Sequence, residues 1–423
     1  MIEEAPSYKV NSKTADIISN SVYYSLINKI NNDYLYFDKV KYHVPEGISK
    51  EDFWSAIKLS RLGNTITFGP FSFHYKLTDK MSELLYKFDK SLFNDFKILK
   101  EQSYYQQSSI IEEAIASSKM EGATTTRVIA KQMILKNAKP KDISERMIMN
   151  NYKTIDFIKN HKDDDLTTTL ILNIHRSITD STLNNSLFEG HFRDSNDIFV
   201  VNGITGDVAH EPPSYKLICS LIESVCEFAN NQKSFIHPIL KAIIIHFMIS
   251  YIHPFVDGNG RTARALFYWY LIKNDYSIIE FLSISKIIYR SKNQYEKSFI
   301  YSELDDLDIG YFITYNLKAL DKSYEELIGY IEKKQKAETF IIRNQNINDR
   351  QNQILNLYID NPNIIFTSKD LEKYLDKTVK TIRSDLNHLV SLGLLDIVKI
   401  NKRLRGYSRS KMFELKLEEI RGN

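Results

Sequence analysis

The chain has 423 residues, of which 43% are hydrophobic and 26% charged, so it can bury a normal core and wholesale disorder is excluded. This length allows two or three domains of roughly 100–200 residues each. The net charge of only +3 argues against attraction of the whole molecule to polyanions and leaves local basic patches open.

The compartment is predicted from the first residues, the apolar runs and the cysteines. The start, MIEEAPSYKV, lacks the charged-then-apolar pattern of a secretory signal. The most apolar run, residues 238–252, carries Lys241 and His246 and is shorter than the roughly twenty residues of a membrane helix. Cys219 and Cys226 lie about 10 Å apart along a helical pattern, too far for a disulfide. We therefore expect a cytoplasmic protein.

The first 95 residues predict a mixed region of helices and turns. Residues 51–61 and 77–92 have helical spacing, and a turn-rich stretch around Gly63 and Gly69-Pro70 separates them. From residue 96 to about 335 the pattern predicts one helix after another. The segments with helical periodicity are residues 110–119, 140–159, 166–177, 214–230, 238–252 and 262–273.

One segment of the helical region has a strand pattern instead. Residues 197–208, DIFVVNGITGDV, place β-branched residues around Asn202-Gly203, which is a hairpin signature. A lone hairpin in a helical domain favours a role in contact with a ligand or a partner.

The segment HPFVDGNGRTAR, residues 253–264, collects the residue types of a phosphate site between two predicted helices. Glycines let backbone amides approach a ligand, and amides at a helix N-terminus attract anions. Gly258-Asn259-Gly260 therefore predicts a cradle for phosphate oxygens. Arg261 and Arg264 begin the next helix and would add charged hydrogen bonds to phosphate.

Two further residues of this segment suit nucleotide chemistry. Asp257 suits Mg²⁺, which usually takes one or two carboxylates together with substrate phosphates. His253 is the only nearby group that titrates near neutrality, so it suits a general base. Phe255 fits a core position that holds the loop. Each residue alone has a structural interpretation, but the combination predicts binding of a Mg-nucleotide beside a base that activates an acceptor.

The segment matches the signature H-x-F-x-[DE]-G-N-G-R-x-x-R of the Fic family at every fixed position, and the resemblance covers roughly residues 96–320. It implies a mainly α-helical Fic fold and transfer of AMP from ATP to a hydroxyl of a target protein, with release of pyrophosphate. By this resemblance His253 deprotonates the Ser, Thr or Tyr hydroxyl and Asp257 holds Mg²⁺. By the same resemblance, the anion hole that holds the phosphates consists of Gly258, Asn259 and Gly260, and Arg261 and Arg264 neutralise the phosphate charge.

The resemblance also gives the predicted hairpin a role. Fic proteins carry a β-hairpin flap that pins the backbone of the target by strand addition, and residues 197–210 occupy its expected place. Tyr295 lies where relatives often present an aromatic residue near adenine, although a core or surface tyrosine is an equally simple interpretation. The flap residues that would border the nucleotide are Asp207, Val208, Ala209 and His210.

A second motif lies upstream of the Fic core. SSKMEG contains Ser117-x-x-x-Glu121-Gly122, which matches the family's inhibitory pattern [ST]-x-x-x-E-[GN]. On a helix of about residues 108–121, Ser117 and Glu121 share one face. The position resembles the class whose inhibitory helix is N-terminal within the same chain. There Glu121 would pair with Arg264 and withdraw it from the γ-phosphate of ATP.

A connector and a small module follow. Residues 321–347 predict a charged helix, and residues 348–412 predict three helices, a strand and a basic turn, an order that resembles a winged helix-turn-helix domain before a tail at 413–423. Such a module binds DNA or serves only in protein contact. The side chains that could reach DNA are Lys377, Lys380, Thr381 and Arg383 on the third helix and Lys399, Lys402, Arg403, Arg405 and Arg409 on the wing.

The leading hypothesis is an autoinhibited protein adenylyltransferase that modifies a hydroxyl of a target protein or of the chain itself. The reverse reaction, removal of AMP with Glu121 orienting water, is one alternative. A DNA-binding regulator whose Fic core senses nucleotide is another. Phosphate transfer is disfavoured, because Doc-like relatives have a lysine at the position of Gly260. Relatives often form dimers, so a homodimer is compatible with this hypothesis.

Overall fold

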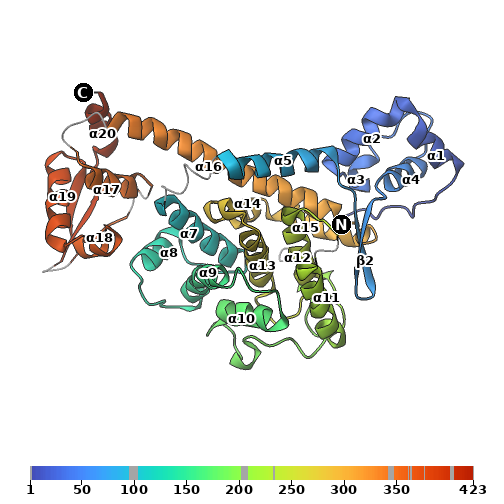
Figure 1. The fold of residues 1–423 in the computed structure, drawn as a ribbon, viewed down its shortest axis with the longest axis horizontal. Coiled ribbons are helices and arrows are strands. Elements are labelled where there is room, and N and C mark those ends of the chain that lie inside the picture. The colour runs from blue at the N-terminus through green and yellow to red at the C-terminus, as the bar shows by residue number, and fades with distance from the viewer. Residues whose placement is uncertain are drawn as a thin grey trace. The chain divides into compact units, whose positions relative to one another are not determined.

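The computed structural model divides into two compact units, Met1–Thr124 with Asp142–Tyr324 and Thr125–Lys141 with Glu325–Asn423. Both units are mainly helical, as predicted (Figure 1). The described residues are 2–94, 103–201, 208–231, 234–341, 347–360, 362, 364–375, 377–400 and 404–422.

The N-terminal part of the first unit packs short helices around one hairpin. The helices are α1 (Ser12–Ser19), α2 (Ser21–Asp33), α3 (Phe37–Val40), α4 (Lys50–Ser60) and α5 (Asp79–Asn94). The predicted helices at 51–61 and 77–92 correspond to α4 and α5. The stretch between them, expected as turns, is an antiparallel hairpin of β1 (Asn64–Phe68) and β2 (Phe71–Tyr75). Its inward positions alternate with exposed ones, and Ile66, Phe68, Phe73 and Tyr75 are buried.

A helical core follows, and it holds the motif segment. Its helices are α7 (Ser103–Met120), α9 (Ile143–Asn160), α10 (Thr168–Thr179), α11 (Ile218–Asn230), α12 (Pro238–Ile252), α13 (Asn259–Lys273), α14 (Ile284–Arg290), α15 (Lys292–Leu304) and the part of α16 (Gly310–Ile341) up to Tyr324. Twelve of the fifteen residues are buried in each of α12 and α13, which pack side by side (Figure 1). Helices apolar or buried on all sides lie inside a domain, so the motif loop joins the two innermost helices.

The strands of the predicted flap hairpin are short. β3 (Val200–Val201) pairs antiparallel with β4 (Val208–His210), with Val200 opposite His210. The turn predicted at Asn202-Gly203 lies outside the described residues. Single 3₁₀ turns at Ser186–Phe188, Tyr215–Leu217 and Ser277–Phe281 complete this unit.

The second unit combines α8 (Arg127–Leu135) with the C-terminal elements. These are α17 (Asp349–Asp360), α18 (Ser368–Leu375), α19 (Val379–Ser391), β5 (Leu395–Lys399), β6 (Arg405–Arg409) and α20 (Phe413–Gly422). A salt bridge of 3.8 Å joins Lys136, just after α8, to Asp370 of α18. The segment expected as a tail is instead the helix α20, because Phe413 and Leu417 are buried within the unit.

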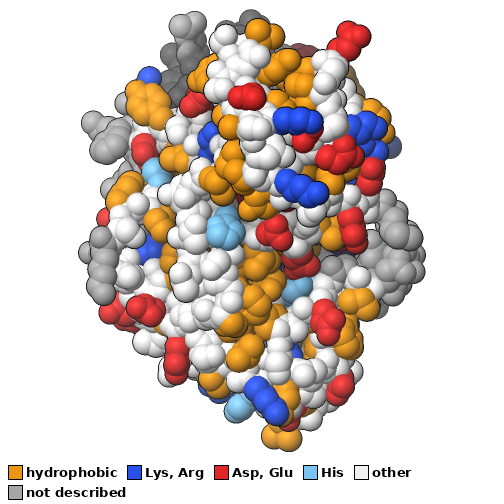
Figure 2. Space-filling model, turned by 90° about the vertical axis from the view of Figure 1, so that its right-hand side faces the viewer, with side chains coloured by type: hydrophobic (Ala, Val, Ile, Leu, Met, Phe, Trp, Pro, Cys, Tyr) orange, Lys and Arg blue, Asp and Glu red, His pale blue; other side chains and the backbone are white. Residues whose placement is uncertain are grey.

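On the face shown in Figure 2, Lys and Arg, Asp and Glu, and hydrophobic side chains of the described residues lie intermixed. None of the helices in the described ranges has an apolar stretch of the length and hydropathy needed to cross a membrane.

Candidate active site

The motif loop begins at His253, which ends α12 in the left-handed backbone conformation (φ 47°, ψ 58°). Few residues other than glycine adopt this conformation, so the surroundings must hold it. Arg193 does so, because its Nε donates to the His253 carbonyl at 2.9 Å. Its other nitrogens donate to the carbonyls of Ser195 (2.7 Å) and Pro213 (2.5 Å). Arg193 therefore ties the loop to the segments on both sides of the flap hairpin, a role that the sequence did not indicate.

The His253 imidazole is held in its neutral form. Burial and the nearby His210 lower the pKa of His253 to about 4, although Glu121 acts in the opposite direction. His210 itself is fixed at the end of β4, because its Nε2 donates to the Tyr251 carbonyl (2.8 Å) and its Nδ1 lies 2.5 Å from Glu303 Oε1. A neutral imidazole can accept a proton at physiological pH, which is what a general base requires.

The depressed pKa of His253 gives a direct prediction for the free protein. An ordinary histidine, with a pKa near 6.5, is about 90% charged at pH 5.5, whereas His253 should remain neutral from pH 8 to below pH 5. Carbon–proton NMR spectra of the imidazoles would follow this titration, with His253→Ala assigning the resonance. A midpoint near pH 6.5 would contradict the half-buried placement of His253.

The inside of the loop is closed by two buried side chains. Asn259 accepts from the Phe255 amide through Oδ1 and donates to the Phe255 carbonyl through Nδ2, both at 2.8 Å. The Phe255 ring is fully buried and stacks on His175, with centroids 3.7 Å apart. The Asn259 side chain is thus used within the loop, and only its backbone amide can serve an anion.

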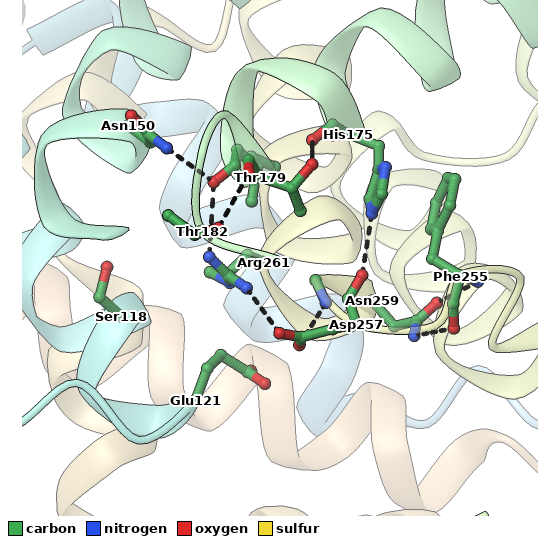
Figure 3. A network of polar contacts seen from close by, with 12 residues as sticks. Ser118, Glu121, Asn150, His175, Thr179, Thr182, Phe255, Asp257, Asn259 and Arg261 are labelled. Carbon is green, nitrogen blue, oxygen red and sulfur yellow. Dashed lines mark hydrogen bonds and ion pairs between the residues drawn. The ribbon is translucent and has the colours of Figure 1, made fainter. Parts of the chain in front are cut away.

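His175 on α10 positions Asp257, and sequence analysis missed it (Figure 3). Its Nδ1 accepts from the Gly190 amide at 3.0 Å, so its proton lies on Nε2, which donates to the Asp257 carbonyl at 2.8 Å. Burial lowers the pKa of His175 to about 4, which preserves this tautomer. In the sequence it is one histidine in an apolar helix, and nothing there indicates a partner so distant along the chain.

The N-terminus of α13 provides the predicted anion cradle. Gly258 precedes the helix at φ 84°, and a Cβ there would come within 2.9 Å of Thr179, so both the backbone conformation and the close packing require glycine. No side chain caps this N-terminus by a hydrogen bond. Its first amides are therefore available to an anion, which the helix dipole also favours.

Asp257 lies at the open side of this cradle, with its side chain 56% exposed. Its Oδ1 accepts from the Gly258 amide at 2.5 Å, and its Oδ2 is 3.5 Å from Arg261 Nη2. Among the described residues, no group of three or more His, Cys, Asp or Glu could hold a metal by itself. One exposed carboxylate fits Mg²⁺ that arrives with the phosphates of a nucleotide.

The two motif arginines differ in how their donors are used. Arg261 is 1% exposed, donates to the Ile178 carbonyl at 3.4 Å and forms an ion pair with Asp257 through Nη2 at 3.5 Å (Figure 3). Neither its Nε nor its Nη2 has a hydrogen-bond partner among the described residues. Unmet donors on a buried cation are costly, so Arg261 suits an anionic ligand. Arg264 is 3% exposed and already bonded within the chain, because its Nε donates to Ser117 Oγ (2.9 Å) and its Nη2 to the Ser117 carbonyl (3.0 Å).

Glu121, in the turn that follows α7, completes the site. Its Oε1 accepts from Arg264 Nη2 at 2.8 Å. Burial opposes ionisation of this carboxyl, but Arg264 outweighs that effect and holds the pKa of Glu121 below its ordinary value. A methyl group placed on Gly260 would overlap the Glu121 carboxylate. The structure thus brings Ser117, Glu121 and Arg264 together, and it places a carboxylate against the N-terminus of α13.

The remaining candidates contribute less. Tyr295 is only 9% exposed, its hydroxyl bonds to His246 Nε2 at 3.0 Å, and its ring packs against Phe299 and Phe312. This packing agrees with the core interpretation of Tyr295, while the adenine contact stays a prediction. Val208 is exposed, whereas Asp207 and the side chain of Ala209 lie outside the described residues.

Comparison with known proteins points to one family. Residues 165–271 match the model of the Fic/DOC family. The chain is 32% identical over 113 residues to the protein adenylyltransferase Fic of Drosophila melanogaster and 32% identical over 117 residues to that of Aedes aegypti, which are 26% and 27% of this chain. It covers 21% of the length of each of these relatives. A Fic family protein from Desulfovibrio desulfuricans G20 has a similar fold, with a TM-score of 0.55, 17% identity, and coverage of 80% of this chain and 98% of that one.

Proposed function

The chain carries a Fic domain, and from this premise we propose that it is a protein adenylyltransferase that transfers AMP from ATP to a target hydroxyl and is inhibited by its own Glu121. The observation that carries the proposal is the carboxylate of Glu121 on the N-terminus of α13, bonded to Arg264. An anion of the chain thus lies beside a cradle suited to phosphate. The relatives named protein adenylyltransferase support the same activity.

The base of the proposed reaction is His253. In its neutral form it takes the proton of a Ser, Thr or Tyr hydroxyl, and the resulting oxygen forms a bond to the α-phosphorus of ATP. The bond from this phosphorus to the oxygen that bridges to the β-phosphorus breaks, and pyrophosphate leaves with the negative charge. Arg193 supports the step by fixing the backbone of His253.

Charge stabilisation comes from the other motif residues. The amides of Asn259 and Gly260 can hold an anion at the start of α13, together with the Nε and Nη2 donors of Arg261, which make no hydrogen bond among the described residues. The Gly258 amide, which the sequence also assigned to this cradle, is bonded to Asp257 Oδ1. Asp257, held in place by His175, would bind Mg²⁺, which neutralises charge on the phosphates when bound. Arg264 would serve the terminal phosphate once Glu121 releases it.

Two labels of ATP test this proposal. Full-length Glu121→Gly is incubated with Mg²⁺ and a mixture of cytosolic proteins, in parallel with α-³²P-ATP and γ-³²P-ATP. AMP transfer retains the α-phosphate on protein and releases the γ-phosphate, so only the first label should become bound. Bound γ-label would indicate phosphate transfer instead. Absence of protein labelling from both nucleotides, with ATP binding confirmed, would contradict a transferase.

Removal of AMP is the second candidate, favoured by one observation. The Glu121 carboxylate is ionised and 26% exposed beside the cradle, so it could orient a water molecule toward a phosphorus bound there. Protein labelled by Glu121→Gly and then purified is a substrate for the test. Wild type should release the label and Glu121→Gly should not, whereas equal release by both would exclude a role of this carboxylate.

A further inference from the structure

The C-terminal part of the second unit presents a basic face that the proposed transferase does not use. One side of α19 is buried through Ile382, Asp385, Leu386 and Leu389, which recur at helical spacing. The opposite side is exposed. Its polar residues from the turn before the helix onward are Lys377, Lys380, Arg383, Ser384 and Asn387.

Basic residues outnumber acidic ones in this segment. Residues 377–409 contain eight Lys and Arg but only two Asp and Glu. Of the two, Asp385 is 3% exposed and already bonded to Arg350 and Gln351. Only Asp396 is exposed. The segment therefore has a strong local positive charge in a chain whose net charge is only +3.

The hairpin that follows α19 places two cations opposite each other. In the antiparallel register of β5 and β6, Lys399 faces Arg405 at the end nearest the turn, and both side chains are exposed. Like charges directly opposite each other destabilise a strand pair. An anion shared by the two would remove this cost. Lys402 and Arg403, also named as wing residues, lie outside the described residues.

We propose that α19 and the β5–β6 hairpin bind duplex DNA. An exposed helix with basic residues at its start fits the wide major groove of B-form DNA, and a basic hairpin beside it can contact phosphates. Double-stranded RNA is a poorer fit, because side chains cannot read its deep and narrow major groove. The helix order α17, α18, α19 and the following hairpin match the predicted winged helix-turn-helix order.

Two of the residues expected to contact DNA have other roles. Arg409 donates to the carbonyls of Tyr358 and Ile359, pairs with Glu414 and lies over the Phe413 ring. Arg409 therefore stabilises the unit, and we do not expect it to contact DNA. The Thr381 hydroxyl lies 3.0 Å from that of Thr378, the cap of α19.

The test measures binding of the full chain to a fluorescent 20-bp duplex of mixed sequence between 50 and 200 mM KCl. Five exposed cations, Lys377, Lys380, Arg383, Lys399 and Arg405, would each neutralise about one phosphate. Affinity should then fall by about 10²–10³-fold over this range. Lys380→Gln with Arg383→Gln should weaken binding on the order of 50-fold at 100 mM and reduce the salt slope by about two.

Lys411→Gln with Lys416→Gln is the matched control, because it removes the same charge outside α19 and the hairpin. This variant should bind within a few-fold of wild type. AMP transfer in the Glu121→Gly background should be unchanged in both double variants, which separates this proposal from the transferase. Absence of salt-dependent binding by wild type, or an equal loss in the control variant, would overturn the proposal. Binding of single-stranded or duplex RNA in preference to duplex DNA would overturn it as well.

Discussion

Replacing Glu121 by glycine should increase the rate of AMP transfer about 100-fold. The reason is that the carboxylate bonds to Arg264 and lies against Gly260, so ATP must bind with its terminal phosphate displaced and its α-phosphate misaligned. A misplacement of about 1 Å can cost on the order of 10²-fold in rate. The measurement is the initial rate of α-³²P transfer to protein by wild type and by Glu121→Gly.

When Glu121 is removed, Arg264 keeps its bonds to Ser117, through one hydroxyl and one carbonyl. A phosphate can displace these neutral acceptors, because hydrogen bonds between charged groups are roughly twice as strong. The inhibitory helix itself should stay in place. Ser109 donates to the Phe281 carbonyl at 2.9 Å and Glu113 accepts from the Ser285 amide at 2.9 Å, so α7 remains anchored two turns away.

Two control variants separate charge from helix stability. Lys119→Gly lowers helix stability in the last turn of α7 by about 1 kcal/mol, more than glycine at position 121 in the turn after the helix should, but leaves the carboxylate, so it should not activate. Glu121→Gln keeps the size and removes the charge, and Glu121→Asp keeps the charge with a shorter reach. Both should give intermediate rates. Activation by Lys119→Gly equal to that by Glu121→Gly would assign inhibition to the order of the helix rather than to the carboxylate.

Acid should not release this inhibition near neutrality. Arg264 holds the pKa of Glu121 below its ordinary value of about 4.5, so the carboxyl protonates only below that pH. A depressed carboxyl pKa means that the contact is present at higher pH and is lost as pH falls through the lowered pKa. Release of the inhibition therefore requires that Glu121 moves or that a phosphate competes for Arg264, because pH changes between 6 and 8 leave both Glu121 and Arg264 charged.

The helices and the motif loop were predictable because their signals are local. The apolar run at 238–252 predicted a buried helix and forms α12 as expected, and the Gly-Asn-Gly turn marked the start of α13. The contact of Glu121 with Arg264 joins residues 143 positions apart. This contact could be predicted only from the family resemblance, which assigns the two motifs that contain Glu121 and Arg264 to one site.

The residues that sequence analysis missed act through backbone atoms far along the chain. Arg193 bonds to carbonyls of His253, Ser195 and Pro213, and His175 to the carbonyl of Asp257. Every residue has a backbone carbonyl, so no pattern of residue types in the sequence indicates which carbonyl accepts such a hydrogen bond. At Tyr295 the sequence left two interpretations open, an adenine contact and a core tyrosine, because only packing distinguishes them, and the structure buries this residue.

The second large effect concerns His253. In the Glu121→Gly background, His253→Ala should lower the rate of AMP transfer by 10²–10⁴-fold, the contribution of a positioned base. Binding of ATP with Mg²⁺, measured by calorimetry, should stay within a few-fold, because the phosphate cradle lies five to eleven positions further along the motif and does not use the imidazole. The loss should therefore appear in kcat, with KM for ATP nearly unchanged.

The backbone of His253 could complicate this result, since alanine disfavours the left-handed conformation found there (φ 47°). His253→Asn is the control, because asparagine tolerates that conformation and has no basic nitrogen to take the proton. Arg193 bonds to the carbonyl, which both variants retain. If the imidazole is the base, His253→Asn must be as inactive as His253→Ala while binding ATP normally. A rate for His253→Asn within a few-fold of the parent would assign the base to another group. Weak ATP binding in His253→Ala but not in His253→Asn would mean that the alanine variant loses activity because the motif loop is distorted.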